Sequence, residues 1–333
     1  MRLFNLPTFC SLFLSRKLSL LFSAAILFAA SFSVNAGAIS AWKVAKYRPL
    51  KIVTTTPDLA CLVEAIGKDR VQVQSLTNAR QNPRYPELKS SAVLCLTEAD
   101  LLIATGMDLE DGWLPVLVES SANPRLRKGG SAYMDASISV APLETPDSFL
   151  QPQTSPHYLL DPENARQAAA AIKNKICALL SADNAERVEQ NYCKFDILLQ
   201  EKIEKWKLIL EPYRGAGFVS DNPAYCYFAE RFGFVQAGNI EPAPGRAPSP
   251  QHLQNLADQM RTKNIAMIWK RNFDPQKPAQ TLSEKTDATI LDFQVFPSHI
   301  GGQQYIQTID TIVNKLAKTL QKNPSHITRL GSL

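Results

Sequence analysis

Residues 183–210 read DNAERVEQNYCKFDILLQEKIEKWKLIL and carry one unbroken helical pattern. Apolar side chains recur along it at steps of three or four, namely Val188, Tyr192, Phe195, Leu199, Ile203, Trp206 and Leu210. This helical spacing is held for about six turns and predicts a helix that ends before Pro212. Asp183 and Glu186 have the spacing of a capping box, so we expect the helix to begin at Asp183. A helix this long is unusual in a compact domain, and we interpret it as a brace between two lobes.

Short strands alternate with helices on both sides of this brace. Before it, residues 51–56, 71–76 and 101–105 are apolar or alternating runs that predict strands. After it, we expect strands at 217–220, 235–240, 265–269 and 288–293, and across the whole chain further helices at 57–67, 162–180, 250–262 and 305–320. Strands separated by helix-length segments favour βα units and a mainly parallel sheet. We therefore predict an α/β fold of the clamshell type, with two βα lobes joined by one long rigid helix.

These patterns divide the chain into four segments. We expect a signal peptide at 1–36, an N-terminal βα lobe at 37–182, the linking helix at 183–212 and a C-terminal βα lobe at 213–333. Residues 137–156 contain four prolines and several Ser and Thr, which predicts a surface loop without a regular element.

The first 36 residues have the three parts of a secretory signal peptide. Arg16 and Lys17 precede the apolar run LSLLFSAAILFAASF at 18–32, and a site of small residues ends at Ala36. An apolar run of 15 residues is short for a membrane span, which needs about 20. We therefore expect export to the periplasm with cleavage after Ala36, and an uncleaved anchor is the alternative.

Composition excludes several classes of protein. Of 333 residues, 45% are hydrophobic and 20% are charged, which excludes a disordered or collagen-like chain. The formal net charge is +5, but three of these charges lie in the acid-free first 36 residues, which leaves +2 for the rest. We therefore expect no nucleic-acid partner. The nucleotide-binding glycine motifs, Gly-x-Ser-x-Gly and His-Glu-x-x-His do not occur, so we expect neither an enzyme nor an organic cofactor.

Five cysteines follow the predicted cleavage site, namely Cys61, Cys95, Cys177, Cys193 and Cys226. Their odd number leaves at least one thiol unpaired, and the sequence has no Cys-x-x-Cys pair that would indicate a redox motif. Because most of them lie in apolar helical patterns, we interpret them as small buried apolar residues.

The stretch SPHYLLDPEN at 155–164 carries the most informative chemical pattern. Asp161, Pro162 and Glu163 suit the N-cap and first turn of a helix. His157 lies in the loop four residues before this cap, outside any apolar stripe. Two interpretations stay open: a metal-ligating or pH-sensitive imidazole, and a surface or interlobe histidine with a structural hydrogen bond.

This stretch resembles the Asn/Asp-Pro-His-x-Trp-Leu-Asp-Pro-Glu-Asn signature of periplasmic zinc- and manganese-type ABC-transporter substrate-binding proteins. Three further pieces fit that family in order, namely the strand and Pro-Asp-Leu at 51–59, the segment at 99–114, and YFAERFG at 227–233. The resemblance extends over most of residues 50–320. It implies a Zn²⁺ or Mn²⁺ ion held in the interlobe cleft by three or four His and carboxylate side chains. It also implies delivery to a membrane permease with an ATPase partner, without catalysis, and we expect a monomer.

The residues at the implied ligand positions depart from the family. The first ligand, a histidine, is matched by Arg84, whose guanidinium has no lone pair to offer. The second ligand is His157, which is intact. The third, a His or Glu, is matched by Asn222, which offers only a neutral carbonyl oxygen. The fourth, a carboxylate, is best matched by Asp292.

Two intact ligands do not make a tight zinc site, which takes four, or three plus water. Asp221 and His299 are the further candidates to complete the set. The alternative is a metal-free relative in which Arg84 pairs with Asp292 or Asp221 across the cleft, or binds an anionic or chelated ligand. An exported protein that binds a partner or regulates, without transport, is a further class that stays open.

Two other features have plain structural interpretations. The tripeptide Trp-Lys-Arg at 269–271 ends an expected strand, and we interpret it as a basic rim. The loop Pro-Ala-Pro-Gly at 242–245 follows another strand on the cleft side, where it suits ligand enclosure or a simple connection.

Overall fold

The structure is a computed structural model that describes residues 48–145, 153–243 and 245–322. Every helix and strand given below lies within the unit Pro49–Leu333. The predicted signal peptide at 1–36 and its cleavage site lie outside the described residues. Among the residues that are described, no helix combines the length and the apolar character needed to cross a membrane.

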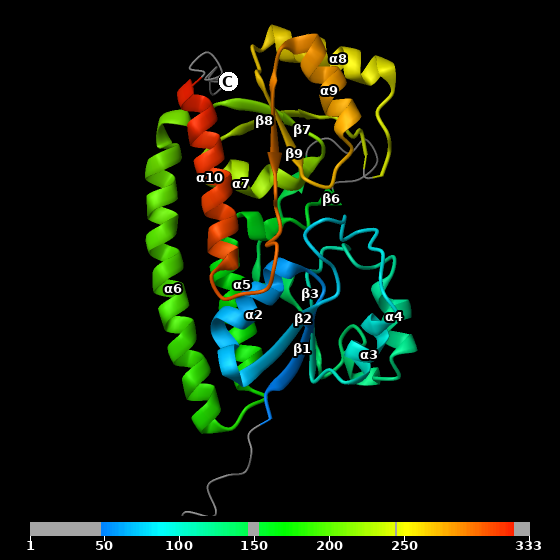
Figure 1. Ribbon diagram of the computed structural model, residues 1–333, viewed down its shortest axis with the longest axis vertical. Coiled ribbons are helices and arrows are strands. Elements are labelled where there is room, and N and C mark those ends of the chain that lie inside the picture. The colour runs from blue at the N-terminus through cyan, green and yellow to red at the C-terminus, as the bar shows by residue number, and fades with distance from the viewer. Residues whose placement is uncertain (1–47, 146–152, 244, 323–333) are drawn as a thin grey trace, which may run out of the picture. The chain divides into compact units, whose positions relative to one another are not determined.

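Four parallel strands form the sheet of the N-terminal lobe, in the order β2-β1-β3-β4 (Figure 1). They are β1 (Leu50–Thr54), β2 (Val71–Ser75), β3 (Leu101–Ala104) and β4 (Tyr133–Asp135). All four residues of β3 are buried, as its unbroken apolar sequence predicts for a central strand. The chain adds β2 on one side of β1 and β3 on the other, and such a change of direction opens a crevice at the carboxyl ends of the strands.

A second parallel sheet, in the order β10-β9-β7-β8, forms the C-terminal lobe. Its strands are β7 (Gly217–Ser220), β8 (Val235–Asn239), β9 (Met267–Arg271) and β10 (Thr289–Phe293). Trp269 is fully buried at the centre of this sheet and stacks on Phe218 with ring centroids 3.7 Å apart. The order changes direction between β7 and β9, so this lobe also opens a crevice where these two strands end.

Nine α-helices surround the two sheets within the described residues. They are α2 (Pro57–Gly67), α3 (Ser91–Thr97), α4 (Leu114–Ser120), α5 (Pro162–Cys177), α6 (Ala182–Leu210), α7 (Cys226–Phe232), α8 (Pro250–Thr262), α9 (Gln276–Thr286) and α10 (Gln304–Lys322). Short 3₁₀ helices lie at Lys68–Arg70, Pro124–Leu126, Ala136–Ser139, Tyr158–Leu160, Glu211–Tyr213 and Pro223–Tyr225. A small antiparallel pair joins β5 (Glu144–Thr145) to β6 (Gln153–Thr154).

Helix α6 is the predicted brace. Its 29 residues span roughly 43 Å at 1.5 Å per residue. Figure 1 shows it lying alongside α10, and it also packs against α2 and α5. Every member of the predicted apolar stripe is buried except Tyr192, which is partly exposed. The predicted capping box is wrong, because the helix begins at Ala182 and its N-cap, Ser181, makes no side-chain cap bond.

The largest apolar core runs through both lobes and the brace. It contains Ile52 of β1, Leu199 and Trp206 of α6, Trp269 of β9 and Val313 of α10, all buried. The lobes therefore share this core along α6 and α10, and each lobe also has a smaller core of its own on the far side of its sheet, around Leu102 in the N-terminal lobe and Ile268 in the C-terminal lobe. The predicted lobe boundaries stay predictions. Helix α6 begins close to one of them, at Ala182, and ends close to the other, at Leu210.

Local sequence explains most of the other elements. At the start of α5, the Asp161 carboxylate accepts a hydrogen bond from the Glu163 N–H and Pro162 takes the first helical position, as predicted. The prediction of no regular element at 137–156 is wrong, since β5 and β6 pair within it. The strand expected at 265–269 lies two residues later, at Met267–Arg271. All five cysteines of the described region are free thiols, and of these Cys61 is buried whereas Cys193 is exposed.

Candidate functional site

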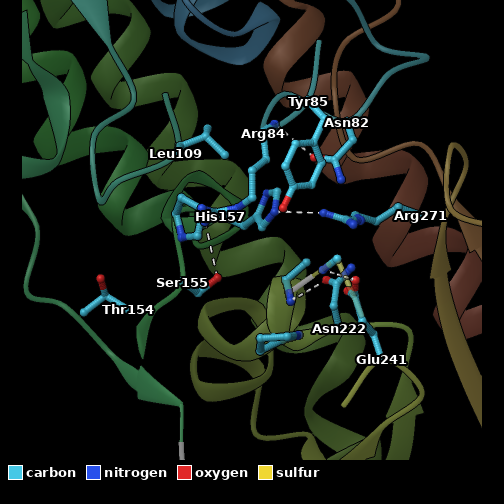
Figure 2. Close-up of a pocket in the computed structure, with 14 residues that line it drawn as sticks. Asn82, Arg84, Tyr85, Leu109, Thr154, Ser155, His157, Asn222, Glu241 and Arg271 are labelled. Atoms are coloured by element: carbon cyan, nitrogen blue, oxygen red, sulfur yellow. Dashed lines mark hydrogen bonds between the residues drawn. The ribbon is translucent and has the colours of Figure 1, made fainter. Parts of the chain in front are cut away.

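A small cavity of about 60 Å³ lies where the loops at the carboxyl ends of the two sheets meet. The N-terminal lobe contributes residues 82, 84 and 85 after β2, Leu109 after β3, and residues 154–157 before α5. The C-terminal lobe contributes residues 222–224 after β7, Glu241 and Gly245 after β8, and Arg271 at the end of β9. Figure 2 shows Arg84 and Arg271 reaching into this pocket beside His157. The two sheet crevices therefore meet in one site.

Arg271 is the most firmly held side chain of the pocket. It ends β9, and its side chain is only 6% exposed. Its Nε and Nη2 donate to the two carboxylate oxygens of Asp274, each at 2.7 Å. Its guanidinium also lies over the Phe273 ring, 4.7 Å from the centroid. This bidentate pair and the stacking contact fix the direction of the third nitrogen, Nη1, toward His157.

His157 lies in the loop just before the 3₁₀ helix Tyr158–Leu160, in contact with the C-terminal lobe. Its Nε2 is 3.0 Å from Arg271 Nη1 (Figure 2). Burial lowers the pKa of His157 well below its usual range, and the positive charges of Arg271 and Arg84 lower it further. The imidazole is therefore neutral at physiological pH, and its Nε2 accepts a hydrogen bond from an obligate donor. Of the two interpretations that the sequence left open, this geometry favours the interlobe histidine with a structural hydrogen bond.

Arg84 reaches the pocket from the loop after β2. Its backbone N–H donates to Asn82 Oδ1 at 3.0 Å, and its Nη1 donates to the backbone oxygen of Asp108 at 3.2 Å. The predicted pairing of Arg84 with Asp292 or Asp221 is wrong, since neither carboxylate forms an ion pair with it among the described contacts. The Arg84 charge is left available to the pocket.

Asn222 occupies the pocket wall at the end of β7. It is 8% exposed and is the N-cap of the 3₁₀ helix Pro223–Tyr225, where its Oδ1 accepts the Ala224 N–H at 3.1 Å. The oxygen that the sequence offered as a weak ligand is thus already used in a structural cap. The predicted metal set is weaker at this position than the residue type alone suggests.

Asp221 lies next to the Arg271–Asp274 pair but outside the pocket lining. It is 7% exposed, and its Oδ2 has no hydrogen-bond partner among the described residues. Burial raises the pKa of Asp221, and the neighbouring Asp274 charge raises it further. Burial and the Asp274 charge therefore both disfavour ionisation of Asp221.

Asp292 and His299 also fall outside this pocket. Asp292 is 46% exposed on β10, 3.6 Å from Lys270 Nζ, and the alternation of the strand turns it away from the buried Leu291 and Phe293. His299 is exposed, with its Nδ1 3.2 Å from Ser298 Oγ. The chain that leaves β10 does pass beside His157, since the Phe296 ring centroid is 6.2 Å from that of His157, but Asp292 and His299 themselves are not among the residues that line the pocket.

The donor chemistry of the described residues does not match a bare divalent cation. No group of three His, Cys, Asp or Glu side chains comes together to hold a metal ion in residues 48–145, 153–243 and 245–322. Among the described residues that line the pocket, Glu241 is the single acidic one. Sequence reasoning missed it, and it placed Arg271 on a basic rim. For Arg271, the signal that could have identified it as a pocket residue was an arginine at the end of a strand with an aspartate three residues later.

Comparison with known proteins identifies relatives over almost the whole chain. The family model described as zinc-uptake complex component A, periplasmic, matches residues 52–319. The manganese ABC transporter substrate-binding lipoprotein PsaA of Streptococcus mitis is 25% identical over 319 residues, covering 92% of this chain and 100% of that protein. The iron ABC transporter substrate-binding lipoprotein MtsA of Streptococcus pyogenes serotype M6 is 22% identical and covers 93% and 100%.

Solved structures show the same fold. The crystal structure of ZnuA superposes with a TM-score of 0.70 at 24% identity, covering 81% of this chain and 99% of that chain. The solute-binding protein FpvC of Pseudomonas aeruginosa, in complex with Mn²⁺, superposes with a TM-score of 0.72 at 19% identity, covering 83% and 100%. The resemblance in sequence, the two-lobed fold and the family match agree. This chain belongs to the family of zinc-uptake complex component A, the metal-type solute-binding proteins of ABC transporters.

Proposed function

We propose that this chain is the extracytoplasmic solute-binding component of a zinc- and manganese-type ABC transporter. It is exported to the periplasm by a signal peptide cleaved after Ala36 and binds its solute in the pocket between the lobes. It then delivers the solute to a membrane permease that has an ATPase partner. It acts as a monomer and needs neither an organic cofactor nor a nucleic acid.

The observation that carries this proposal is the convergence of Arg84, His157 and Asn222 on one pocket. These residues lie far apart in sequence and come from both lobes, yet each occupies a position where the resemblance implies a ligand. A pocket at the carboxyl ends of parallel strands is also where open α/β folds bind small molecules. Fold, family and pocket position thus support the same function.

The contacts around the pocket favour a stiff connection between the lobes. Arg231 of α7 donates from Nε and Nη2 to both oxygens of Asp161, at 2.8 and 2.9 Å, and so joins the C-terminal lobe to the cap of α5. The Tyr305 hydroxyl of α10 donates to the backbone oxygen of Leu159 at 2.7 Å. We therefore expect solute to enter through small movements of the pocket loops, with α6 and these contacts kept intact.

The cargo that we propose is Zn²⁺ or Mn²⁺. PsaA is named for manganese and MtsA for iron, and His157 is the histidine at a position in this chain where the resemblance implies a ligand. A second candidate is an anionic or chelated solute, which a specific observation favours: two guanidinium groups, Arg84 and Arg271, line the pocket. Both candidates share the same delivery to a permease.

Cellular metal content tests the proposed function. We expect deletion of the gene in the source organism to lower zinc, manganese or iron content under metal limitation, as measured by mass spectrometry. The full chain should restore that content, and so should Leu208→Ala, an exchange on the exposed face of α6. Unchanged metal content after deletion would overturn the proposal. The exported protein that binds a partner or regulates, without transport, would then be the remaining class.

A further inference from the structure

We infer that this pocket recognises an anionic group, a carboxylate or a phosphate, through Arg84 and Arg271, so that a metal ion enters only as a complex with an anionic chelator. The inference rests on the proposed solute-binding function and names the chemical class of its solute. Its starting point is that two permanent cations line a cavity where the resemblance implies cation ligands.

Arg271 lines the pocket and has N–H groups that are not used by its contacts with Asp274 and His157. A guanidinium has five N–H groups. Two of them bind Asp274 and one binds His157, so two remain, one on each terminal nitrogen. Because the side chain is 6% exposed and held by its bidentate partner, these donors are pre-oriented. A small anion that meets them loses little affinity to side-chain ordering.

Arg84 supplies a second, less constrained cation from the opposite lobe. Its Nη1 binds the neutral backbone oxygen of Asp108, and no carboxylate of the described residues forms an ion pair with it. Its positive charge is therefore not neutralised by an ion pair. Charge-assisted hydrogen bonds from arginine to carboxylate or phosphate are among the strongest contacts in protein recognition.

His157 disfavours a bare metal ion for a stereochemical reason. Arginine only donates hydrogen bonds, so the lone pair of His157 Nε2 is engaged by Arg271 Nη1, 3.0 Å away. Metal ligation at Nε2 would require Arg271 to be displaced from a buried pair. An anion leaves that pair intact, and the tautomer that it fixes gives His157 an additional donor at Nδ1.

The pocket selects for size and distinguishes two forms of the solute. Its free space of about 60 Å³ is small, which suits one carboxylate or phosphate group with the rest of a larger solute outside. Glu241, whose carboxylate accepts the Gly245 N–H, is the acidic residue in the lining. It repels a free anion but offers an oxygen to the metal of a chelate. The charge of Glu241 therefore distinguishes a free anion, which it repels, from a metal chelate, whose metal it can bind.

Calorimetric titration tests the inference. The sample is the protein purified after expression of the full chain and stripped of metal. The probes are inorganic phosphate, citrate, zinc citrate and zinc chloride alone. The variants are Arg84→Met, Arg271→Met and Glu241→Gln. Arg80→Met is the matched control, because Arg80 is an exposed arginine of the same loop that does not line the pocket. A thermal melt of each variant verifies folding, and Arg84→Met, at a partly buried position, remains decisive if Arg271→Met does not fold.

We expect one-to-one binding of at least one anionic probe and no such binding of zinc chloride alone. Arg84→Met and Arg271→Met each weaken that binding roughly tenfold or more, whereas Arg80→Met leaves it unchanged. Glu241→Gln strengthens binding if the solute is a free anion and weakens it if the solute is the zinc complex. Both results support the inference.

Three results would overturn the inference: saturable one-to-one binding of zinc alone, loss of anion binding in Arg80→Met equal to that in Arg84→Met, or no binding of any anionic probe. The metal content of the deletion strain distinguishes these outcomes from failure of the proposed function. A strain that loses metal, together with a protein that binds no anion, leaves the transport function standing and removes only the anionic solute.

Discussion

At the scale of single residues, the pocket depends on the Arg271–Asp274 pair. Its side chains are 6% and 7% exposed, so loss of one partner leaves a buried charge without its counterion. The Asp258–Arg261 pair has the same sequence separation, but its side chains are 60% and 49% exposed. The two pairs form a natural comparison of buried with exposed ion pairs.

We predict that Asp274→Asn lowers the free energy of unfolding by about 2–3 kcal/mol, partly offset by ionisation of the neighbouring Asp221. Asp258→Asn should lower it by about 0.5 kcal/mol or less, because solvent screens that pair. Urea unfolding of both variants checks the prediction. Equal effects of the two exchanges would show that the Arg271 pair contributes no more than a surface contact.

Asp58 gives the fold a pH dependence. It is 9% exposed in the first turn of α2, and burial raises its pKa from 3.8 to about 6. The unfolded chain releases this proton near pH 4, whereas the folded protein keeps it to about pH 6. Stability therefore falls as pH rises between these values, by about 3 kcal/mol in total.

We predict that Asp58→Asn is more stable than the unmodified protein at pH 7.5, by up to about 3 kcal/mol, and that the difference disappears near pH 4. The amide retains an oxygen that can accept the Leu59 N–H. Thermal melts at the two pH values measure this, and Asp111→Asn on the surface is the control. A difference that does not change with pH would rule out titration of Asp58 as its cause.

Sequence reasoning located part of the pocket and missed part of it for physical reasons. Arg84, His157 and Asn222 were found because each lies in a short local pattern that resembles a family motif. Arg271 carried no such pattern, and it meets His157 only because β9 lies beside β7 in the sheet and ends at the same crevice. Contacts that the sheet order creates are not visible in local sequence.

At the scale of elements, the brace helix was predictable because its period is long and regular. The apolar stripe predicted the buried face of α6, although the helix begins at Ala182, one residue before the predicted start at Asp183. The seven-residue helix α3 escaped prediction because two turns give too short a period to distinguish helix from loop, and the 11-residue α9 was missed as well. Strand β10 was found, but local sequence did not show that the Asp292 side chain lies on the exposed face of this strand, outside the pocket lining.

Two leucines of α6 test the packing of the brace. Leu199 is fully buried in the shared core, whereas Leu208 is 77% exposed on the same helix. We predict that Leu199→Ala lowers the free energy of unfolding by about 3 kcal/mol, because it removes buried apolar area and leaves a cavity. Leu208→Ala should change it by less than about 0.5 kcal/mol. Similar losses in both variants, measured by urea unfolding, would contradict the buried face.

At the scale of the whole molecule, the shared core makes the lobes interdependent. The core cluster joins residues of β1, α6, β9 and α10. We predict that Pro49–Leu333 unfolds in one cooperative transition, so that tryptophan fluorescence and far-ultraviolet circular dichroism give the same urea midpoint. Fluorescence reports strongly on Trp206 and Trp269, which are buried in this core. Two separated midpoints would show that the lobes fold independently.

Zinc binding by the metal-free protein tests most directly whether this pocket has lost the family's cation site. The measurement is a zinc titration against a competing colorimetric chelator, for the unmodified chain and for the double variant Arg84→His/Asn222→Asp. Asn222→Asp keeps an oxygen that can accept the Ala224 N–H while adding a carboxylate. We predict no tight one-to-one zinc binding by the unmodified chain and a clear gain in the double variant, since its two new donors would then join the Glu241 carboxylate at the pocket. Tight one-to-one binding by the unmodified chain, not improved by the double variant, would contradict a pocket governed by Arg84 and Arg271.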